Sequence, residues 1–206
     1  MTKINYLFII VLSLFMTACQ VSQQQNSTSI VNQWQNHQHD LEQINTFQVN
    51  GSIAHFSNKT RSYGRFLIHQ QSDDRFDIKL TTPVGTSILS LKVEPNYAQL
   101  IDKDGNNYNG NNIEDLMSKV SNVNIPLNSL HNWLKGYSNN SSADKLDKSG
   151  RLTATEFIQN NNKWQLKIAS YSTYTFRNKK IDLPSSIELN HNDELIRLKI
   201  SNWILR

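Results

Sequence analysis

Cysteine is almost absent from this chain, and after residue 15 so are long apolar runs. The one cysteine, Cys19, cannot form a disulfide within the chain or a zinc site built from several thiolates. The longest apolar run, residues 6–15, has about ten residues, whereas a helix needs about 20 to cross a bilayer. Any domain in this chain must therefore be stabilised by its hydrophobic core alone.

A concentrated basic block is missing as well. The formal net charge is +4, from 21 Lys and Arg against 17 Asp and Glu, so the sequence gives no support to nucleic-acid binding. It also lacks a G-x-S-x-G elbow and the glycine loops of Walker or Rossmann type. We therefore expect no enzyme activity and no cofactor, although a catalytic cluster assembled only by folding stays open.

Two patterns resemble metal sites but are better explained without a metal. The stretch 102–107 (DKDGNN) resembles a calcium loop, yet Gly105 stands at the fourth place instead of the sixth, and Ile113 stands where a bidentate Glu is needed. We predict a turn there. His37 and His39 fall on a predicted helix, where residues two apart point to different sides. We therefore expect no metal.

The N-terminus has the organisation of a secretory signal. Lys3 supplies a basic start, the apolar run follows, and residues 16–19 (MTAC) resemble the lipobox of bacterial lipoprotein precursors. Met16 departs from the usual leucine. We predict a signal peptide over residues 1–18 and a mature N-terminus at Cys19 that carries an N-palmitoyl and an S-diacylglycerol group. An ordinary signal peptide with a chance cysteine is the alternative.

The residue after Cys19 indicates in which membrane the protein is anchored. Gln20 stands where, in bacterial lipoproteins, an aspartate favours retention in the inner membrane. We therefore expect a lipid-anchored protein on the inner leaflet of the cell outer membrane, facing the periplasm. The polar residues 20–28 (QVSQQQNST) carry no periodicity and predict a flexible tether. Residues 29–206 then form a single domain.

Within this domain the pattern is mainly that of strands. A helix is predicted over about 29–44, where apolar residues share one face, and from Phe47 the period changes to two. A second apolar helix is predicted at 113–120 after Asn112, and a short one at 127–134 before Gly136. The strands are predicted at 47–54, 65–70, 75–81, 87–93, 97–102, 151–158, 163–170, 173–177, 185–190 and 194–203, with a polar loop at 137–147.

Strands joined by short turns, such as the one at Asp104-Gly105, form an antiparallel meander. A sheet with this many strands should curl. Apolar helices over its open side would then enclose an apolar interior suited to lipid. We place on its lining Trp34, Phe47, Val49, Phe66, Ile78, Leu89, Leu91, Leu116, Leu130, Trp133 and Trp164.

Several segments, taken in order, resemble the outer-membrane lipoprotein receptor family LolB, and the resemblance runs from about Trp34 to Trp203. They are 47–52 (FQVNGS), 80–91 (LTTPVGTSILSL), 125–136 (IPLNSLHNWLKG), Trp164, Leu183-Pro184 and 200–204 (ISNWI). One departure is Leu67-Ile68, where the family usually has a tryptophan. The resemblance implies a mainly β (α+β) fold: an incomplete antiparallel barrel of about ten or eleven strands with a helical lid and a hydrophobic cavity.

The resemblance also implies a function. Members of this family take the acyl chains of lipoproteins from the periplasmic carrier LolA and pass them into the phospholipid of the outer membrane, without catalysis. They use a protruding loop tipped by an apolar residue, which here corresponds to Pro83, Val84 and Gly85, with Val84 at the tip. We expect a monomer.

Two other functions stay open on the residues alone. One is a structural or adaptor lipoprotein whose barrel is packed solid and binds protein partners on its surface. The other is a periplasmic hydrolase, which would need a cluster of Ser or Glu with His at one mouth of the sheet.

Overall fold

The computed structural model describes the backbone of residues 18–120, 125–140, 142–159 and 161–206, and their side chains from residue 28 onwards. Residues 1–17 of the predicted signal peptide lie outside the described residues, as does the side chain of Cys19, so the predictions for this segment stay predictions. In the described part, no helix is long and apolar enough to span a membrane.

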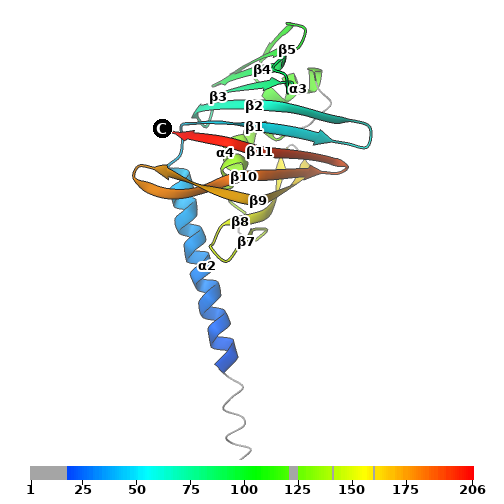
Figure 1. Ribbon diagram of the computed structural model, residues 1–206. Helices are drawn as coiled ribbons and strands as arrows, with labels where there is room; N and C mark the ends of the chain where they lie inside the picture. The colour runs from blue at the N-terminus through cyan, green and yellow to red at the C-terminus, as the bar shows by residue number, and fades with distance from the viewer. Residues whose placement is uncertain (1–17, 121–124, 141, 160) are drawn as a thin grey trace, which may run out of the picture.

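The described residues form one antiparallel sheet of eleven strands in the order β6-β5-β4-β3-β2-β1-β11-β10-β9-β8-β7. The two halves of the meander meet where β1 pairs with β11, and β6 and β7 are the outer edges, so the sheet curls without closing (Figure 1). The predicted incomplete barrel is confirmed. The bounds are β1 Phe47–Phe56, β2 Arg61–Ser72, β3 Arg75–Thr81, β4 Ser87–Glu94, β5 Tyr97–Asp102, β6 Asn107–Gly110, β7 Lys145–Leu146, β8 Leu152–Gln159, β9 Asn162–Phe176, β10 Lys179–His191 and β11 Glu194–Leu205.

The predicted set of strands was wrong in two ways: two predicted strands are one, and two short strands were not predicted. The predicted strands 163–170 and 173–177 are one strand, β9, and the chain reverses after it at Arg177 and Asn178, whose φ angles are +49° and +64°. No glycine or proline marks that turn, so its usual signal was missing. The short edge strands β6 and β7 were not predicted, because four and two residues are too few to show a period.

Helices cover one face of the curled sheet: α3 (Ile113–Val120), the 3₁₀ turn η1 (Leu127–Ser129) and α4 (Leu130–Lys135). The Oδ1 of Asn112 accepts a hydrogen bond from the backbone N of Glu114 at 2.9 Å, which confirms the predicted N-cap. Gly136 ends α4 with φ +74°, as expected for a glycine terminator. The face of the sheet under these helices carries the buried side chains of the core.

Helix α2 (Ala18–Glu42) corrects the predicted tether. It was expected to begin near Ser29, but its backbone is helical from Ala18, so residues 20–28 are not irregular. Glutamine is a good helix former and no glycine or proline interrupts the segment, which accounts for the difference. Figure 1 shows the first half of α2 extending away from the sheet. The second half packs on the domain through Trp34 and Leu41, both buried.

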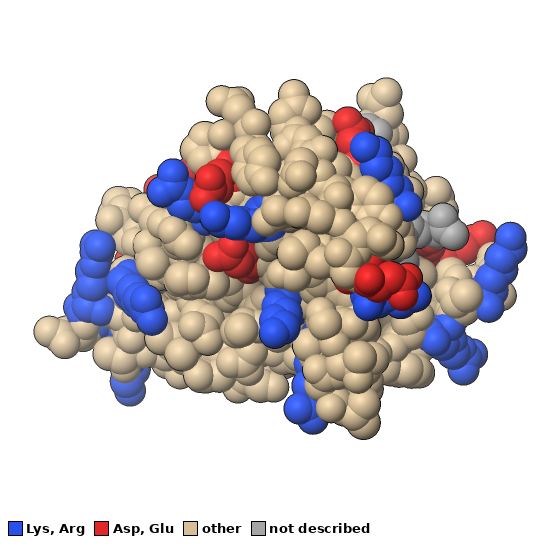
Figure 2. Space-filling view, turned by 90° about the horizontal axis from the view of Figure 1, so that it is seen from above, with Lys and Arg blue, Asp and Glu red and all other residues tan. Residues whose placement is uncertain are grey.

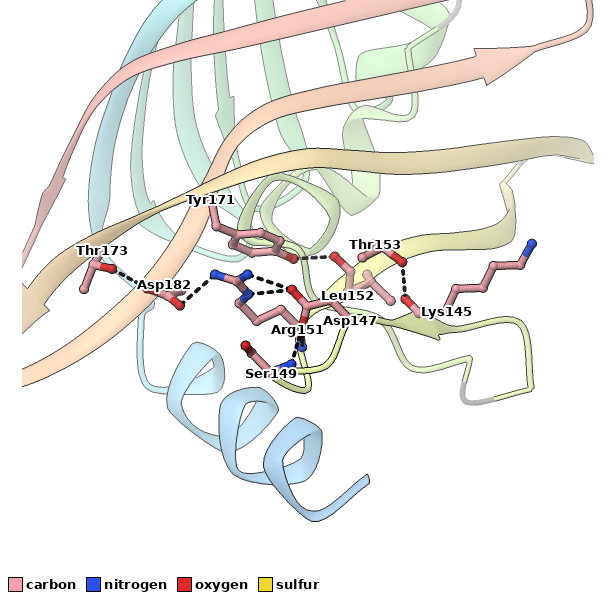
Figure 3. A network of polar contacts seen from close by, with 9 residues as sticks. All are labelled: Lys145, Asp147, Ser149, Arg151, Leu152, Thr153, Tyr171, Thr173 and Asp182. Atoms are coloured by element: carbon pink, nitrogen blue, oxygen red, sulfur yellow. Dashed lines mark hydrogen bonds and ion pairs between the residues drawn. The ribbon is translucent and has the colours of Figure 1, made fainter. Parts of the chain in front are cut away.

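A polar network fixes the loop that supports α2 (Figure 3). Arg151 bonds to the carboxylate of Asp147 at 2.7 Å and to that of Asp182 at 3.1 Å, and its guanidinium lies 5.0 Å from the centre of the Tyr171 ring. Gly150 contacts α2 so closely that a Cβ there would lie 2.8 Å from the backbone N of Trp34. The loop around Gly150 therefore packs closely against α2.

Candidate functional site

A small apolar cavity lies between the sheet and the helices. Its volume is about 40 Å³, a few times the roughly 10–15 Å³ that a cavity needs to hold one water. Six residues predicted to line the interior border it: Phe66, Ile78, Leu89, Leu91, Leu130 and Trp133. The remaining lining is also apolar and consists of Ile53, Ile68, Leu80, Met117, Ile125, Leu127 and Leu198.

The other five residues predicted for the lining are buried but do not border this cavity: Trp34, Phe47, Val49, Leu116 and Trp164. Phe47 packs on Trp203, with ring centres 5.1 Å apart, and Trp164 stacks on His191 at 4.9 Å. The strand and helix periods identify which side chains are buried. They do not tell which of these face a void and which face another ring.

One of the two residues that stand where the family usually has a tryptophan borders this cavity. Ile68 is buried and borders the cavity, whereas Leu67 points to the opposite face of the sheet and is half exposed. The wall formed by Ile68 therefore remains apolar, as expected, with a smaller side chain.

A larger pocket of about 360 Å³ adjoins the cavity towards one end of the sheet. The two share the side chains Ile53, Leu80, Leu89, Met117 and Ile125. Polar residues, His55, Ser62, Asp102, Lys103, Asp104 and Tyr108, contribute to the rest of the wall. We call this space the mouth pocket. The mouth pocket thus brings apolar side chains that also line the cavity close to solvent.

The predicted protruding loop stands beside this pocket. The backbone N of Thr82 donates to the O of Thr86 at 2.8 Å, and the N of Gly85 donates to the O of Thr82 at 2.9 Å, which closes a tight turn. Gly85 has φ +96°, a conformation that favours glycine. Val84 at the tip is 90% exposed. Leu80 and Ile88, from the strands on either side of the loop, line the mouth pocket, so loop and pocket adjoin.

Two hydrogen-bonding features fix α4 to neighbouring segments outside the sheet. The indole N of Trp133 donates to the O of Pro126 at 2.9 Å, which fixes the approach of the chain to α4. The ammonium of Lys135 is buried and donates to the backbone O of Leu41 and of Ile44, and burial lowers its pKa. Sequence reasoning missed Lys135, because its partners lie more than 90 residues away along the chain.

A polar seam joins the helices to the opposite edge of the sheet. The side chain of Gln159, at the end of β8, donates to Glu114 Oε1 on α3 and accepts a hydrogen bond from Ser129 Oγ at 2.5 Å. Burial raises the pKa of Glu114, whose second carboxylate oxygen is buried without a partner. We call these three residues the seam. It closes the open side of the incomplete barrel.

One His, one Ser and one Glu do meet at the mouth pocket. His55 and Ser62 are cross-strand neighbours that both line it, and Glu194 Oε1 lies 3.9 Å from His55 Nε2. However, His55 Nε2 has no hydrogen-bond partner, so neither a nucleophile–base bond nor a base–carboxylate bond is formed. The residue types that a hydrolase needs lie close together here, but the hydrogen bonds that a catalytic triad requires are not formed.

The turn predicted at Asp102 is present, and the two histidines of the other metal-like pattern lie apart. Asp102 Oδ1 accepts hydrogen bonds from the backbone N of Asp104 and of Asn106, both at 2.9 Å, so its carboxylate is used in a turn. His37 is partly buried whereas His39 is exposed, which places them on different sides of α2. Among the described residues no group of three or more His, Cys, Asp or Glu is placed to hold a metal.

The face shown in Figure 2 has no charge pattern that would indicate the kind of partner it binds. Acidic and basic side chains lie scattered over it with uncharged surface between them. That face therefore carries no continuous patch of one sign.

The fold belongs to a known class. It resembles a LolA superfamily protein from Nitrosomonas europaea with a TM-score of 0.54, covering 87% of this chain and 93% of that one, at 12% sequence identity. Residues 45–203 match the family model described as outer membrane lipoprotein LolB. Over 196 residues the chain is 34% identical to the outer-membrane lipoprotein LolB of Klebsiella pneumoniae (strain 342), covering 94% of this chain and 95% of that protein. The chain belongs to the LolB family of outer-membrane lipoproteins.

Proposed function

We propose that this protein accepts lipoproteins from the periplasmic carrier LolA and incorporates them into the outer membrane by moving their acyl chains, without catalysis. The observation that carries the proposal is that the apolar cavity and the mouth pocket share a wall of apolar side chains, next to the loop that exposes Val84. The family membership supports the same role.

Acyl chains need more room than the interior offers in this structure. A cavity of about 40 Å³ is far below the roughly 300–1,000 Å³ of ordinary ligand pockets, whereas the mouth pocket of about 360 Å³ lies within that range. Entry of a chain therefore requires the helices to move away from the sheet. Transfer then follows from differential binding, since a difference of about 1.4 kcal/mol between donor and acceptor is tenfold in equilibrium.

The Val84 loop serves the delivery step in this proposal. Pro83, Val84 and Gly85 form its tip, and burial of one valine side chain in lipid contributes about 1.5–3 kcal/mol. This is too little to anchor the protein but enough to hold the mouth pocket transiently against the phospholipid. Acyl chains can then leave the pocket without crossing water.

The anchor belongs to the same proposal. An acylated Cys19 would hold the protein at the inner leaflet, facing the periplasm, as a monomer. The second half of helix α2 packs on the domain, so its first half would separate the domain from the lipid. The residues 20–28 then act as a helical spacer instead of a flexible one.

An adaptor lipoprotein with a packed barrel is the second candidate, because the small interior cavity favours it. Displacement of a fluorescent fatty acid separates the two functions. A receptor binds the probe and releases it to competing acyl chains, whereas a packed barrel binds none.

The direct test is transfer of a lipoprotein from loaded LolA to the purified mature protein. We expect the lipoprotein to leave the carrier and co-purify with this protein, and then to appear in vesicles of outer-membrane phospholipid. No transfer, together with correct lipoprotein localisation in cells depleted of this protein, would overturn the proposal.

A further inference from the structure

A second groove lies on the other side of Trp133. Its volume is about 680 Å³, and Trp133 lines both this groove and the apolar cavity. Five consecutive residues of β8, Thr155 to Gln159, form one wall. Successive side chains of a strand point to opposite faces, so a groove that touches all five runs along the edge of the strand.

This edge of β8 is free in the described part of the chain. Its neighbour β7 pairs only with Leu152 and Ala154, at the far end of the strand. Residues 137–140 and Ala143 form the opposite wall, and they contact the strand through side chains. Ser138 Oγ lies 3.3 Å from Thr155 Oγ1, and Asn140 Nδ2 donates to the backbone O of Glu156 at 3.0 Å.

The bond from Asn140 shows which backbone groups face the groove. In an antiparallel ladder alternate residues bond to the neighbouring strand, and those between them point away from it. The O of Glu156 points away from β9, because Asn140 reaches it from the groove. Ile158, two residues further, therefore also presents its N–H and C=O to the groove. Asn140 supplies the donor that an added strand would supply.

We infer that this groove binds the peptide that follows the acylated cysteine of a cargo lipoprotein, as an extended strand added to the edge of β8. The inference rests on the proposed function. Addition of a strand to an exposed edge gives affinity through backbone hydrogen bonds with little demand on sequence, which suits a receptor for many cargoes.

The position of the groove identifies the occupant. Ser129 and Gln159 of the seam line it, so an acyl chain that enters where the seam opens leaves its cysteine beside Trp133 and its peptide in the groove. Glu156 and Lys163 pair with each other at 2.6 Å, so the lining has no unbalanced charge. An uncharged polar peptide fits such a wall, and residues 20–28 of this chain (QVSQQQNST) are an example of one.

The test uses two probes on the mature protein: a triacylated cysteine amide, and the same group followed by the peptide QVSQQ. Affinity is measured by displacement of a fluorescent fatty acid. We expect the peptide to raise affinity about tenfold. Ile158→Pro removes the N–H that faces the groove and spares the ladder to β9, whereas Ile158→Thr loses the same apolar side chain and keeps the N–H. The gain should vanish in Ile158→Pro and persist in Ile158→Thr.

Hydrogen exchange of the unmodified protein gives a second readout that needs no variant. The amides of Glu156 and Ile158 should become protected with the peptide probe and not with the cysteine amide. Binding of the cysteine amide without any gain from the peptide overturns this inference and leaves the proposed function intact. Failure of the cysteine amide to bind overturns both. Weaker LolA binding by Ile158→Pro with an unchanged peptide gain would assign the edge to the carrier and overturn the inference.

Discussion

The ammonium of Lys135 donates a hydrogen bond to the backbone O of Ile44 at 3.0 Å. Through this bond and a second one to Leu41, the end of α4 is tied to the end of α2. The helix that covers the cavity and the helix that leads to the proposed lipid anchor are thus joined at one buried point. A displacement of α4 should therefore also displace the end of α2.

Lys135→Met tests this connection. The methionine fills similar volume but leaves the two carbonyl oxygens without their donor, which should destabilise the fold by about 1–3 kcal/mol. Chemical denaturation measures the loss, and Lys119→Met, an exposed lysine on α3, is the control that should change little. Equal stability of the two variants would show that the Lys135 bonds contribute nothing.

The same substitution carries a pH dependence. Burial lowers the pKa of Lys135 below its ordinary value of about 10.4, so between the two values the unfolded chain binds this proton and the folded protein does not. The free energy of unfolding gains a contribution that rises with pH across that window. The difference between wild type and Lys135→Met should therefore shift in favour of wild type as pH rises to 10.

Val84→Glu should leave the fold and LolA binding intact and block delivery into vesicles. The side chain is 90% exposed, so a charge there costs the folded protein little but opposes insertion into lipid. Val31→Glu, at a half-exposed valine on α2, is the matched control and should deliver normally. Normal delivery by Val84→Glu would remove this loop from the mechanism.

The seam should limit how fast acyl chains enter. Gln159→Met removes both of its hydrogen bonds and should raise the association rate of a fluorescent fatty acid several-fold. Glu114→Gln keeps an oxygen that can accept from Gln159, so the rate should stay near that of wild type. Stopped-flow fluorescence makes the comparison, and equal rates for all three proteins would mean that chains enter elsewhere.

Glu114 also gives a pH signature in stability. Burial raises its pKa, so from the unfolded value of about 4.3 up to the folded one the folded protein holds the proton more tightly than the unfolded chain. This contribution to stability is complete below the unfolded value and is lost as pH rises through the folded one. Glu114→Gln should therefore flatten the decline seen in denaturation of wild type above pH 4.

Gly51 is required by the pairing of β1 with β11. The register shifts between Asn50 and Gly51, and a Cβ on Gly51 would lie 2.1 Å from the backbone O of Lys199. Gly51→Ala should cost about 1–3 kcal/mol in denaturation, since a backbone must move to make room. Gly110→Ala is milder, because its added Cβ meets only the flexible end of Leu116 at 3.3 Å. A similar loss of stability in both variants would show that the close contact of Gly51 with Lys199 is not what requires a glycine there.

The sequence predicted the repeating features well and the unique contacts poorly. The burial of Phe47 and Val49 follows from their alternation, whereas the exposure of Val84 was expected from the family resemblance, and the structure agrees with both. Cavity volume depends on how side chains from many strands interlock, so Trp164 and Phe66 could not be told apart as packed or bordering a void. The bond from Lys135 to Ile44 joins distant segments and leaves no local pattern.

The central claim is that cargo acyl chains occupy the space between the sheet and the helices. Its most direct measurement uses a lipoprotein with a photoreactive group in one acyl chain, transferred from LolA to this protein and cross-linked before vesicles are added. Mass spectrometry should find the cross-links on cavity-lining residues such as Ile78, Leu89 and Leu130. Cross-links confined to the outer surface of the sheet would contradict the claim.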